Sequence, residues 1–351
     1  MHADTARRQT EAAGAALVAH ETAEAARILQ THPDSPPGPA TLLFSVDGAM
    51  VPLVGGQWKD VRTLAVGEVQ PPQARADGPV IQTTQLSSCS RLTDSTTVAD
   101  LALWELHRRG IARAGRVGAV VDGAEWCQPF IDDHDPEAVR ILDLPHAAEH
   151  LTAIGQTSGP DGPLLSPTDQ QRVRQALRDA GPAGVLAELR PLVAACPPDA
   201  AAHSHLASLE TRQAQLQYPK VVADGWPIGS GMVESANTLV VEDRLKGAGM
   251  HWAAANVNPI LALRNAWCND RRAEAWAHAE RGLRQQAAAQ RQARRMARHP
   301  VPAPTPPPPP PPPVLAPPAT PPTPGAPVAK PPHPWRRPWS IRRQRTLVGA
   351  A

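Results

Sequence analysis

Three acidic residues stand where an enzyme could use them together. Asp47 ends a strand-like run, Asp122 ends a second one, and Glu234 lies in the first turn of the helix after Gly-Ser-Gly. Carboxylates gathered from strand ends and a helix start repel one another, and a divalent cation offsets that repulsion. Hard oxygen ligands without a Cys or His cluster favour Mg²⁺ or Mn²⁺ over zinc. The three residues therefore predict a two-metal site, in which the ions would clamp the attacking and leaving oxygens of a phosphodiester displacement.

Each of these residues also has a simpler interpretation. Asp47-Gly48 and Asp122-Gly123 are Asp-Gly dipeptides, which are common in turns. Glu234 is a first-turn carboxylate of the kind that the helix dipole favours. Taken singly, each residue is more often structural than catalytic, so the metal-site interpretation requires one fold that positions all three.

The elements around these residues predict a mixed α/β fold. The runs TLLFSVD and WKDVRTLAVGEV flank Gly55-Gly56 and predict a β-hairpin, because glycine tolerates the positive φ of tight turns. A weaker strand is predicted near PVIQTT, then a helix over 96–114, buried strands at RVGAVVD and AVRILD, and a helix that Pro145 opens. A single helix is predicted at MVESANTLVVEDRLK. This order predicts a mixed sheet with an antiparallel hairpin on one side.

Composition divides the chain into five parts. They are a helical remnant and linker (1–40), the first part of the core (41–154), an all-helical insertion (155–225), the second part of the core with a basic helix (226–299) and a Pro/Arg-rich tail (300–351). The tail contains an unbroken run from Pro306 to Pro313, where missing amide donors and fixed φ angles prevent a helix or a central strand. We expect the tail to be disordered, as a spacer or as a docking segment.

The overall composition excludes several protein classes. The formal net charge is only +2, so it demands no polyanionic partner by itself. The four cysteines, Cys89, Cys127, Cys196 and Cys268, form no C-x-x-C pair, which argues against a zinc ribbon and a disulfide-stapled secreted domain. The start lacks an apolar signal core, and no stretch approaches the ~20 apolar residues needed to span a bilayer. A cytoplasmic location and no membrane partner are therefore predicted.

Basic residues are concentrated late in the chain, and four of them, Arg291, Arg294, Arg295 and Arg298, lie close together. Such runs are usually solvated helix faces. Beside a core that processes phosphodiesters, phosphate binding is the better interpretation, because each neutralised phosphate releases counterions. Tryptophans near the motifs, including Trp58 and Trp226, are interpreted mainly as core residues, with base stacking as the alternative.

Three segments resemble bacterial insertion-sequence transposases of the ISKra (Kra-four) family. They are SVDGAMVPLVGGQWKDVRTLAVGEV, VVDGAEWCQPFIDDHDPEAVRILDLPHAAEHL and YPKVVADGWPIGSGMVESANTLVVEDRLKGAGMHWAAANVNPILALRNAWCN. The third is the most specific, and the similarity runs from about residue 40 to 270. The family is a branch of the DDE transposases, whose catalytic core is RNase H-like and interrupted by a helical insertion. The resemblance implies that fold here.

The resemblance also implies roles for individual residues. It assigns Asp47, Asp122 and Glu234 as the acidic, metal-binding triad. A C/D-x-x-H motif matches Asp143 to His146, so His146 is expected to contact DNA or the metal-bound phosphate, with His150 as a competitor. Other residues of the third segment are expected to contact phosphate; they are Ser230, Asn237, Arg244 and Lys246. Asn237 is also a candidate to orient the Glu234 carboxylate.

The implied activity is metal-dependent cleavage at the ends of a mobile DNA and transfer of the freed strand to target DNA. Its partners would be transposon ends, target DNA and further copies of the chain, in the bacterial nucleoid. Only about forty residues precede the core, where family members carry a longer region, so an N-terminally truncated copy is expected. Two alternatives remain: a decayed or domesticated copy that binds DNA without cleaving it, and a polyproline-bearing scaffold with an inert core.

Overall fold

The computed structural model describes residues 3–75, 78–159 and 162–298. The chain separates into two compact units, Met1–Gln285 and Gln286–Ala351. The first unit holds the sheet and the helices around it. In the second unit, residues 286–298 form the end of an exposed helix. The expected disorder of the tail after residue 300 lies outside the described residues.

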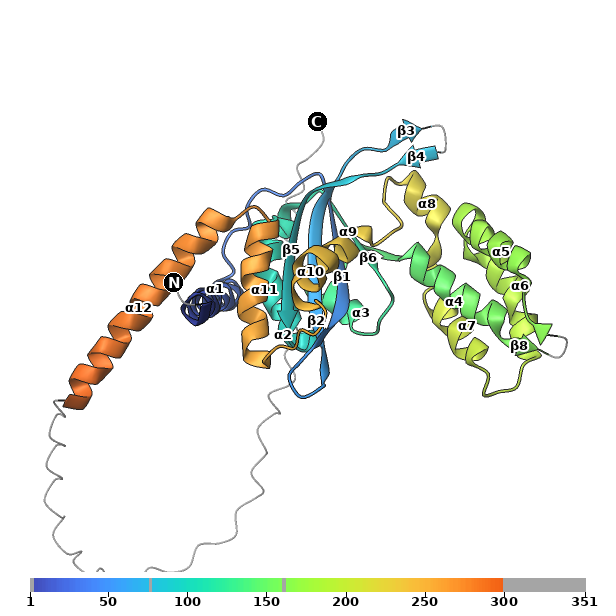
Figure 1. The fold of residues 1–351 in the computed structure, drawn as a ribbon. Coiled ribbons are helices and arrows are strands. Elements are labelled where there is room, and N and C mark those ends of the chain that lie inside the picture. Colours follow the sequence, from blue (N-terminus) through green and yellow to red (C-terminus); the bar gives the residue numbers. More distant parts are fainter. Residues whose placement is uncertain (1–2, 76–77, 160–161, 299–351) are drawn as a thin grey trace, which may run out of the picture. The chain divides into compact units, whose positions relative to one another are not determined.

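A mixed five-stranded sheet forms the centre of the first unit (Figure 1). In the order β5-β2-β1-β6-β7, its strands are Thr83–Leu92, Trp58–Val69, Thr41–Pro52, Arg116–Val121 and Val139–Leu142. Strand β1 pairs antiparallel with β2, and β2 with β5, whereas β1–β6 and β6–β7 are parallel. The predicted α/β class and the predicted hairpin are therefore confirmed. Gly55 and Gly56, with φ of 91° and 76°, turn the chain between β1 and β2.

The strand predicted near PVIQTT is split in the structure. Its start forms β4 (Gly78–Val80), which pairs with β3 (Gln73–Arg75), and its end opens the much longer β5. The sequence of β5, TTQLSSCSRL, is too polar to predict a buried strand, but its hydroxyl groups form hydrogen bonds inside the fold. Thr63 donates to the buried Ser90 at 2.9 Å, and Asn269 accepts from the Ser88 amide at 2.8 Å. Such satisfied hydroxyls allow a polar strand to be buried.

Helices cover the sheet and extend beyond it. Before the insertion they are α1 (Ala3–Thr31), α2 (Ser95–Arg108), the short turn η1 (Ile111–Arg113), α3 (Cys127–His134) and α4 (Leu144–Gln156). The insertion contains α5 (Pro167–Ala180), α6 (Pro182–Ala194), α7 (Ala201–Thr211), the short turn η2 (Gln213–Leu216) and α8 (Tyr218–Ala223). The helices after it are α9 (Gly231–Ala236), η3 (Asn237–Glu242), α10 (Asp243–Leu245), α11 (Ala254–Cys268) and α12 (Arg272–Arg298).

Two of the predicted helical segments are more complex than expected. The 155–225 segment is mainly helical, but it also contains the short antiparallel pair β8 (Ser158–Gly159) and β9 (Gly162–Pro163). The helix predicted at MVESANTLVVEDRLK is interrupted by π-helical turns at η3. Such turns are rare and are found frequently at functional sites. No helix among the described residues is long and apolar enough to cross a membrane.

Alternate residues of the central strands face two different hydrophobic clusters. Leu42 and Phe44 of β1 pack with Ala119 of β6 against α2 and α3. Leu43 and Val120 point the other way, into a cluster built largely by the insertion. Further along β1, this second face packs against η3 and α11. Residues of β1 with odd numbers therefore share one face, on which the insertion and the α9–α11 region both lie.

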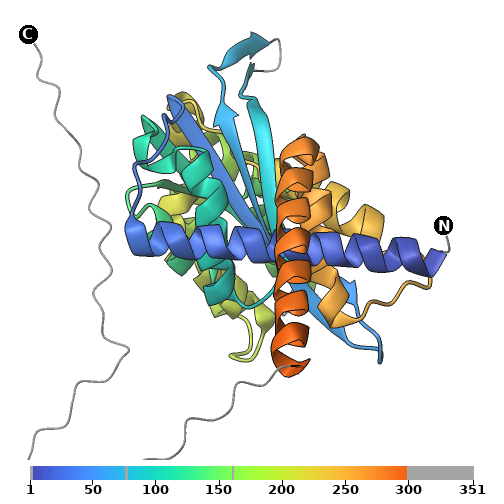
Figure 2. The same ribbon diagram turned by 90° about the vertical axis from the view of Figure 1, so that its left-hand side faces the viewer.

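The N-terminal helix α1 packs on α11 and α2. The first part of α12, residues 272–285, lies against α1 (Figure 2), and a small buried cluster of Ala13, Ala16 and Ala279 forms this contact. The single helix over residues 3–31 agrees with the helical character predicted for the start of the chain.

Candidate active site

Asp47 lies inside strand β1 and not at its end, so the predicted strand boundary was wrong. The ladder with β2 continues through Asp47↔Thr63 and Gly48↔Arg62 to Pro52↔Trp58. The Asp47-Gly48 dipeptide is thus extended backbone, which excludes the turn interpretation at this position. The half-buried Asp47 carboxylate accepts a hydrogen bond from the Gly48 amide at 2.6 Å.

Asp122 directly follows β6, as predicted. Its Oδ1 accepts from the Ala124 amide at 2.8 Å, and Gly123 has a φ of 86°. The chain turns here, so Asp122 is both a strand-end carboxylate and a turn residue. One oxygen orders the turn, and the other remains available to a ligand.

The parallel register brings Asp47 and Asp122 to equivalent places on neighbouring strands. The last pair of the β1–β6 ladder is Phe44↔Ala119, and each aspartate lies three residues further along its own strand. Asp47 shares its face with Leu43, and Asp122 shares its face with Val120, which both belong to the same cluster. The two carboxylates therefore emerge side by side on one face of the sheet.

The two carboxylates lie close enough to repel each other. Burial raises the pKa of Asp47, and the charge of Asp122 adds to the rise. Hydrogen bonds from Gly48 and Asn237 and the charge of His146 oppose this effect. Neither aspartate forms an ion pair among the described residues. A cation at this place would relieve the repulsion.

A buried carboxylate, Asp143, connects this site with the start of α9. It caps α4 by accepting from the His146 amide at 3.1 Å, accepts from the His146 ring Nδ1 at 2.7 Å, and accepts from the Ser230 amide at 2.6 Å. These hydrogen bonds outweigh burial and hold the pKa of Asp143 below its usual value. The hydrogen bond with Asp143 raises the pKa of His146 to about 9. His146 is therefore protonated at neutral pH, and its charge acts on both Asp47 and Asp122.

The helix that carries Glu234 is joined to Asp47 by a different side chain. Asn237 donates from Nδ2 to Asp47 Oδ2 at 2.8 Å, so it orients Asp47. The sequence had suggested Glu234 as its partner. Glu234 is exposed, and its Oε1 accepts from the Ser230 hydroxyl at 3.0 Å. The structure thus brings Asp47 and Asp122 together and keeps Glu234 in contact with its own helix.

The donor chemistry fits a hard divalent cation only in part. Asp47 and Asp122 supply two unpaired carboxylates on one face, which suits Mg²⁺ or Mn²⁺. Yet no group of three or more His, Cys, Asp or Glu side chains in the described part of the chain is arranged to hold a metal ion. Glu234 would have to leave Ser230 before it could serve as a third ligand.

Three other predicted site residues of the first unit contact different side chains. The Arg244 guanidinium stacks 4.9 Å from the Trp252 ring, and Lys246 forms an ion pair with Glu242 at 2.6 Å. His150 faces His205 with 2.9 Å between their Nδ1 atoms. The four late arginines are exposed on the part of α12 in the second unit; they are Arg291, Arg294, Arg295 and Arg298.

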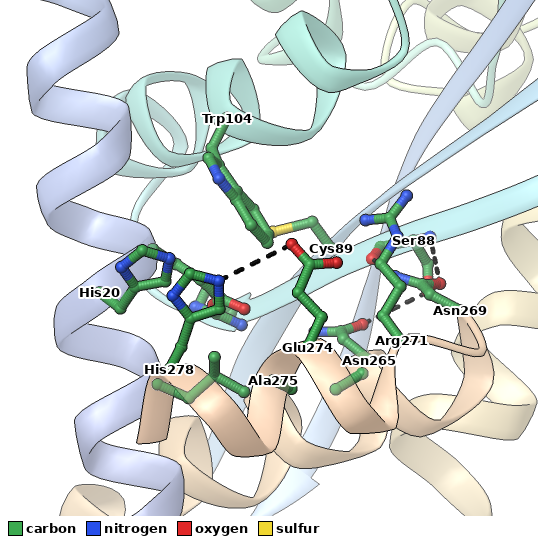
Figure 3. Close-up of a pocket in the computed structure, with 14 residues that line it drawn as sticks. His20, Ser88, Cys89, Trp104, Asn265, Asn269, Arg271, Glu274, Ala275 and His278 are labelled. Carbon is green, nitrogen blue, oxygen red and sulfur yellow. Dashed lines mark hydrogen bonds and ion pairs between the residues drawn. The ribbon is translucent and has the colours of Figure 1, made fainter. Parts of the chain in front are cut away.

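A second polar region lies between α1, β5 and α12 (Figure 3). It encloses only about 20 Å³, which is room for a single water molecule. The buried pair Arg91–Glu21 and the pair Arg271–Glu105 neutralise its charges. Burial raises the pKa of the Cys89 thiol to about 12, so it is no nucleophile at neutral pH. This region joins helices to the sheet and is not a competing active site.

Sequence reasoning missed two contributions to the site. The D-x-x-H motif pointed to Asp143 only as a marker of His146, whereas Asp143 is the buried link itself. Asn237 was noticed for its spacing from Glu234, but its partner Asp47 is 190 positions away.

Comparisons of the chain with protein-family models, curated proteins and solved structures find no match.

Proposed function

We propose that the chain is a DDE-type DNA transposase with an RNase H-like core. The strand order β5-β2-β1-β6-β7, with a long antiparallel side and a short parallel side, supports this core. So does the helix-rich insertion between α4 and α9, which stands where the sequence resemblance implies one. The chain would cleave a phosphodiester at the end of a mobile DNA and direct the freed 3′-hydroxyl at target DNA.

One observation carries the proposal: Asp47 and Asp122 emerge side by side from parallel strands, and neither has an ion-pair partner in the described ranges of the chain. Two half-buried, unpaired carboxylates destabilise a fold. Their retention is understandable if they bind a cation that the reaction needs. If the two aspartates served only as turn residues or as solvated surface residues, their position on the same side of the sheet would have no explanation.

In the proposed mechanism, Asp47 and Asp122 would hold Mg²⁺ or Mn²⁺, and the bound cation would supply Lewis-acid chemistry for phosphodiester cleavage. Asn237 keeps the Asp47 carboxylate oriented through its amide hydrogen bond. The protonated His146 ring, fixed by Asp143, presents positive charge close to both aspartates and suits a contact with phosphate. Glu234 would join the aspartates after exchanging its hydrogen bond with Ser230.

The proposed partners are DNA and further copies of the chain. The exposed arginines of the second unit are suited to phosphate contacts, because they carry no ion pair with a described carboxylate. Arginine binds phosphate through two parallel hydrogen bonds.

A nicking assay tests the proposal. The wild-type chain should nick supercoiled DNA carrying the matching transposon ends with Mg²⁺ or Mn²⁺, and Asp122→Asn should lower the rate at least 100-fold while DNA binding persists. Asp224→Asn, which changes an exposed aspartate, is the control and should nick at the wild-type rate. Equal rates for the wild type and Asp122→Asn would refute the assignment.

A catalytically inactive DNA-binding copy is the second candidate. The separation of Glu234 from the two aspartates favours it, because the described residues form no three-ligand group. On this alternative, the wild-type chain would bind DNA with a steep salt dependence and never nick it with either cation.

A further inference from the structure

An arginine of the helical insertion reaches the turn that carries Asp122. Arg212 lies between α7 and η2, and its Nη2 donates to the carbonyl oxygen of Gly123. The same guanidinium donates from Nη1 to the carbonyl oxygen of Ser208 at 3.4 Å. The insertion, which begins more than thirty positions after Asp122 in the sequence, thus places a positive charge directly beside this aspartate's turn.

The position of this guanidinium is fixed by close packing. A Cβ atom at Gly123 would lie 3.1 Å from Arg212 Nε and 2.7 Å from a methyl group of Leu142. The insertion is also anchored nearby, since the buried Tyr218 hydroxyl donates to the Leu142 carbonyl at 2.9 Å. A group held in this way binds a ligand with little loss of conformational entropy.

Within the described part of the chain, Arg212 Nε is buried without a hydrogen bond. The same holds for Gln128 Nε2 and for Oε1 of Gln215, which follows Arg212 in η2, although these two glutamines contact each other at 3.1 Å. Arg212 forms no ion pair with a described carboxylate. A buried donor that forms no hydrogen bond loses its hydration without replacement, which is unfavourable. The fold therefore retains unused donors and an uncompensated charge next to the aspartate turn.

We propose that Arg212 contacts a phosphate of the DNA strand that lies at Asp122. This inference rests on the proposed function and gives the insertion a task in it, which is to supply a phosphate-binding guanidinium to the acidic site. Arg212 stands beside one aspartate while His146 stands close to both. Together they offset the charge of a DNA backbone that approaches two carboxylates.

The test compares Arg212→Gln with Arg212→Lys and with Arg190→Gln. Arg190 is a matched control, because it belongs to the same insertion but forms an exposed ion pair with Glu210 at 2.7 Å. Binding to the DNA used for nicking is measured in EDTA over a series of salt concentrations. Arg212→Gln should lower the log–log salt slope by ~0.9, the value for one lost phosphate contact, whereas the other two variants should keep the wild-type slope.

A second measurement uses the wild-type chain and does not depend on the folding of a variant. Phenylglyoxal modifies accessible arginines, and mass spectrometry reports the modified positions. DNA should protect Arg212 at least fivefold and leave Arg190 unprotected. Equal protection of the two arginines, or equal salt slopes for Arg212→Gln and Arg190→Gln, would overturn the role of Arg212.

These outcomes are separable from a failure of the proposed function. If the wild type nicks DNA and Arg212 shows neither effect, the transposase proposal stands and the Arg212 contact is wrong. If the wild type never nicks DNA but both Arg212 effects appear, the contact is right and belongs to a DNA-binding protein without cleavage.

Discussion

At the scale of residues, the contact between Asn237 and Asp47 joins the acidic site to the helical segment that follows Ser230. An amide that donates at 2.8 Å stabilises the ionised carboxylate without adding a positive charge. The Asn237 side chain is only 5% exposed, so water cannot replace it easily. This contact opposes the rise that burial and the charge of Asp122 produce in the pKa of Asp47.

Asn237→Asp tests this interpretation, because it places a third carboxylate against Asp47. In EDTA the variant should be about 1–3 kcal/mol less stable than the wild type, since like charges at a buried site repel. Millimolar Mg²⁺ should then raise its melting temperature more than that of the wild type.

Asn256→Asp is the matched control, because Asn256 donates at the same distance of 2.8 Å to a different carboxylate, that of Glu11. Mg²⁺ should shift its melting temperature no more than that of the wild type. Equal Mg²⁺ shifts in Asn237→Asp and Asn256→Asp would mean that Asp47 and Asp122 form no cation site.

Individual site residues were predictable only where local sequence signals exist. Asp122 follows a short apolar run and precedes a glycine, and both signals are local. The Asp47–Asn237 contact joins positions 190 apart, which no local pattern encodes. Burial of tryptophan was predicted correctly at Trp226, which is 1% exposed, and wrongly at Trp58, which is 55% exposed near the end of the hairpin.

At the scale of elements, the sequence was most informative where local propensity and tertiary packing agree. The β1–β2 hairpin combines β-branched runs with two glycines, and both signals favour the same turn. Strand β5 was largely missed, because its serines become acceptable in a strand only when Thr63, Asn265 and Asn269 satisfy them. The π-helical turns of η3 likewise depend on contacts with β1.

The close packing of α1 on α11 gives a second prediction. A Cβ atom at Gly14 would lie 2.2 Å from the Pro259 carbonyl oxygen, and this backbone atom cannot move aside cheaply. Gly14→Ala should therefore lower the free energy of unfolding by about 1–3 kcal/mol, as overpacked contacts do. Urea denaturation measures the change.

The helical Gly184 provides the opposite case. A Cβ atom there would meet nothing within 4 Å, so Gly184→Ala should stabilise the chain by about 0.5–1 kcal/mol through the better helix propensity of alanine. If Gly14→Ala were as stable as Gly184→Ala, α1 would not be packed on α11 in the way described.

At the scale of the whole molecule, the first unit is built around three clusters that share one sheet. The insertion is buried against the same face as Leu43 and Val120, and the α9–α11 region is buried further along that face. The two carboxylates lie where these regions adjoin. The apolar run RVGAVVD predicted a buried strand, but which helices cover which part of the sheet follows only from the three-dimensional packing.

Acid should destabilise the folded chain through His134. Burial lowers the pKa of His134 to about 4, against an ordinary value of 6.5. Its Nε2 atom is buried, although other parts of the residue reach solvent. Between pH 6.5 and 4 the unfolded chain binds more protons than the folded one. The stability from neutral His134 is therefore complete above pH 6.5 and is lost as the pH falls towards 4.

The His134→Leu variant measures this contribution. Its unfolding free energy should fall less between pH 6.5 and 4 than that of the wild type, by roughly 1–3 kcal/mol after allowance for the partial exposure of the residue. His251→Leu, which removes an exposed histidine, should retain the wild-type pH dependence. Parallel pH curves for all three proteins would contradict the assignment.

The central claim is that Asp47 and Asp122 form one cation site. Its most direct test is a titration of the full-length chain with Mn²⁺, in which electron paramagnetic resonance measures the free Mn²⁺. The wild type and the control Asp199→Asn/Asp224→Asn, which changes two exposed aspartates, should bind Mn²⁺ with the same affinity. The double variant Asp47→Asn/Asp122→Asn should lose this binding by at least 30-fold, because both carboxylate ligands are gone. Equal Mn²⁺ affinity in all three proteins would show that the two aspartates hold no metal ion.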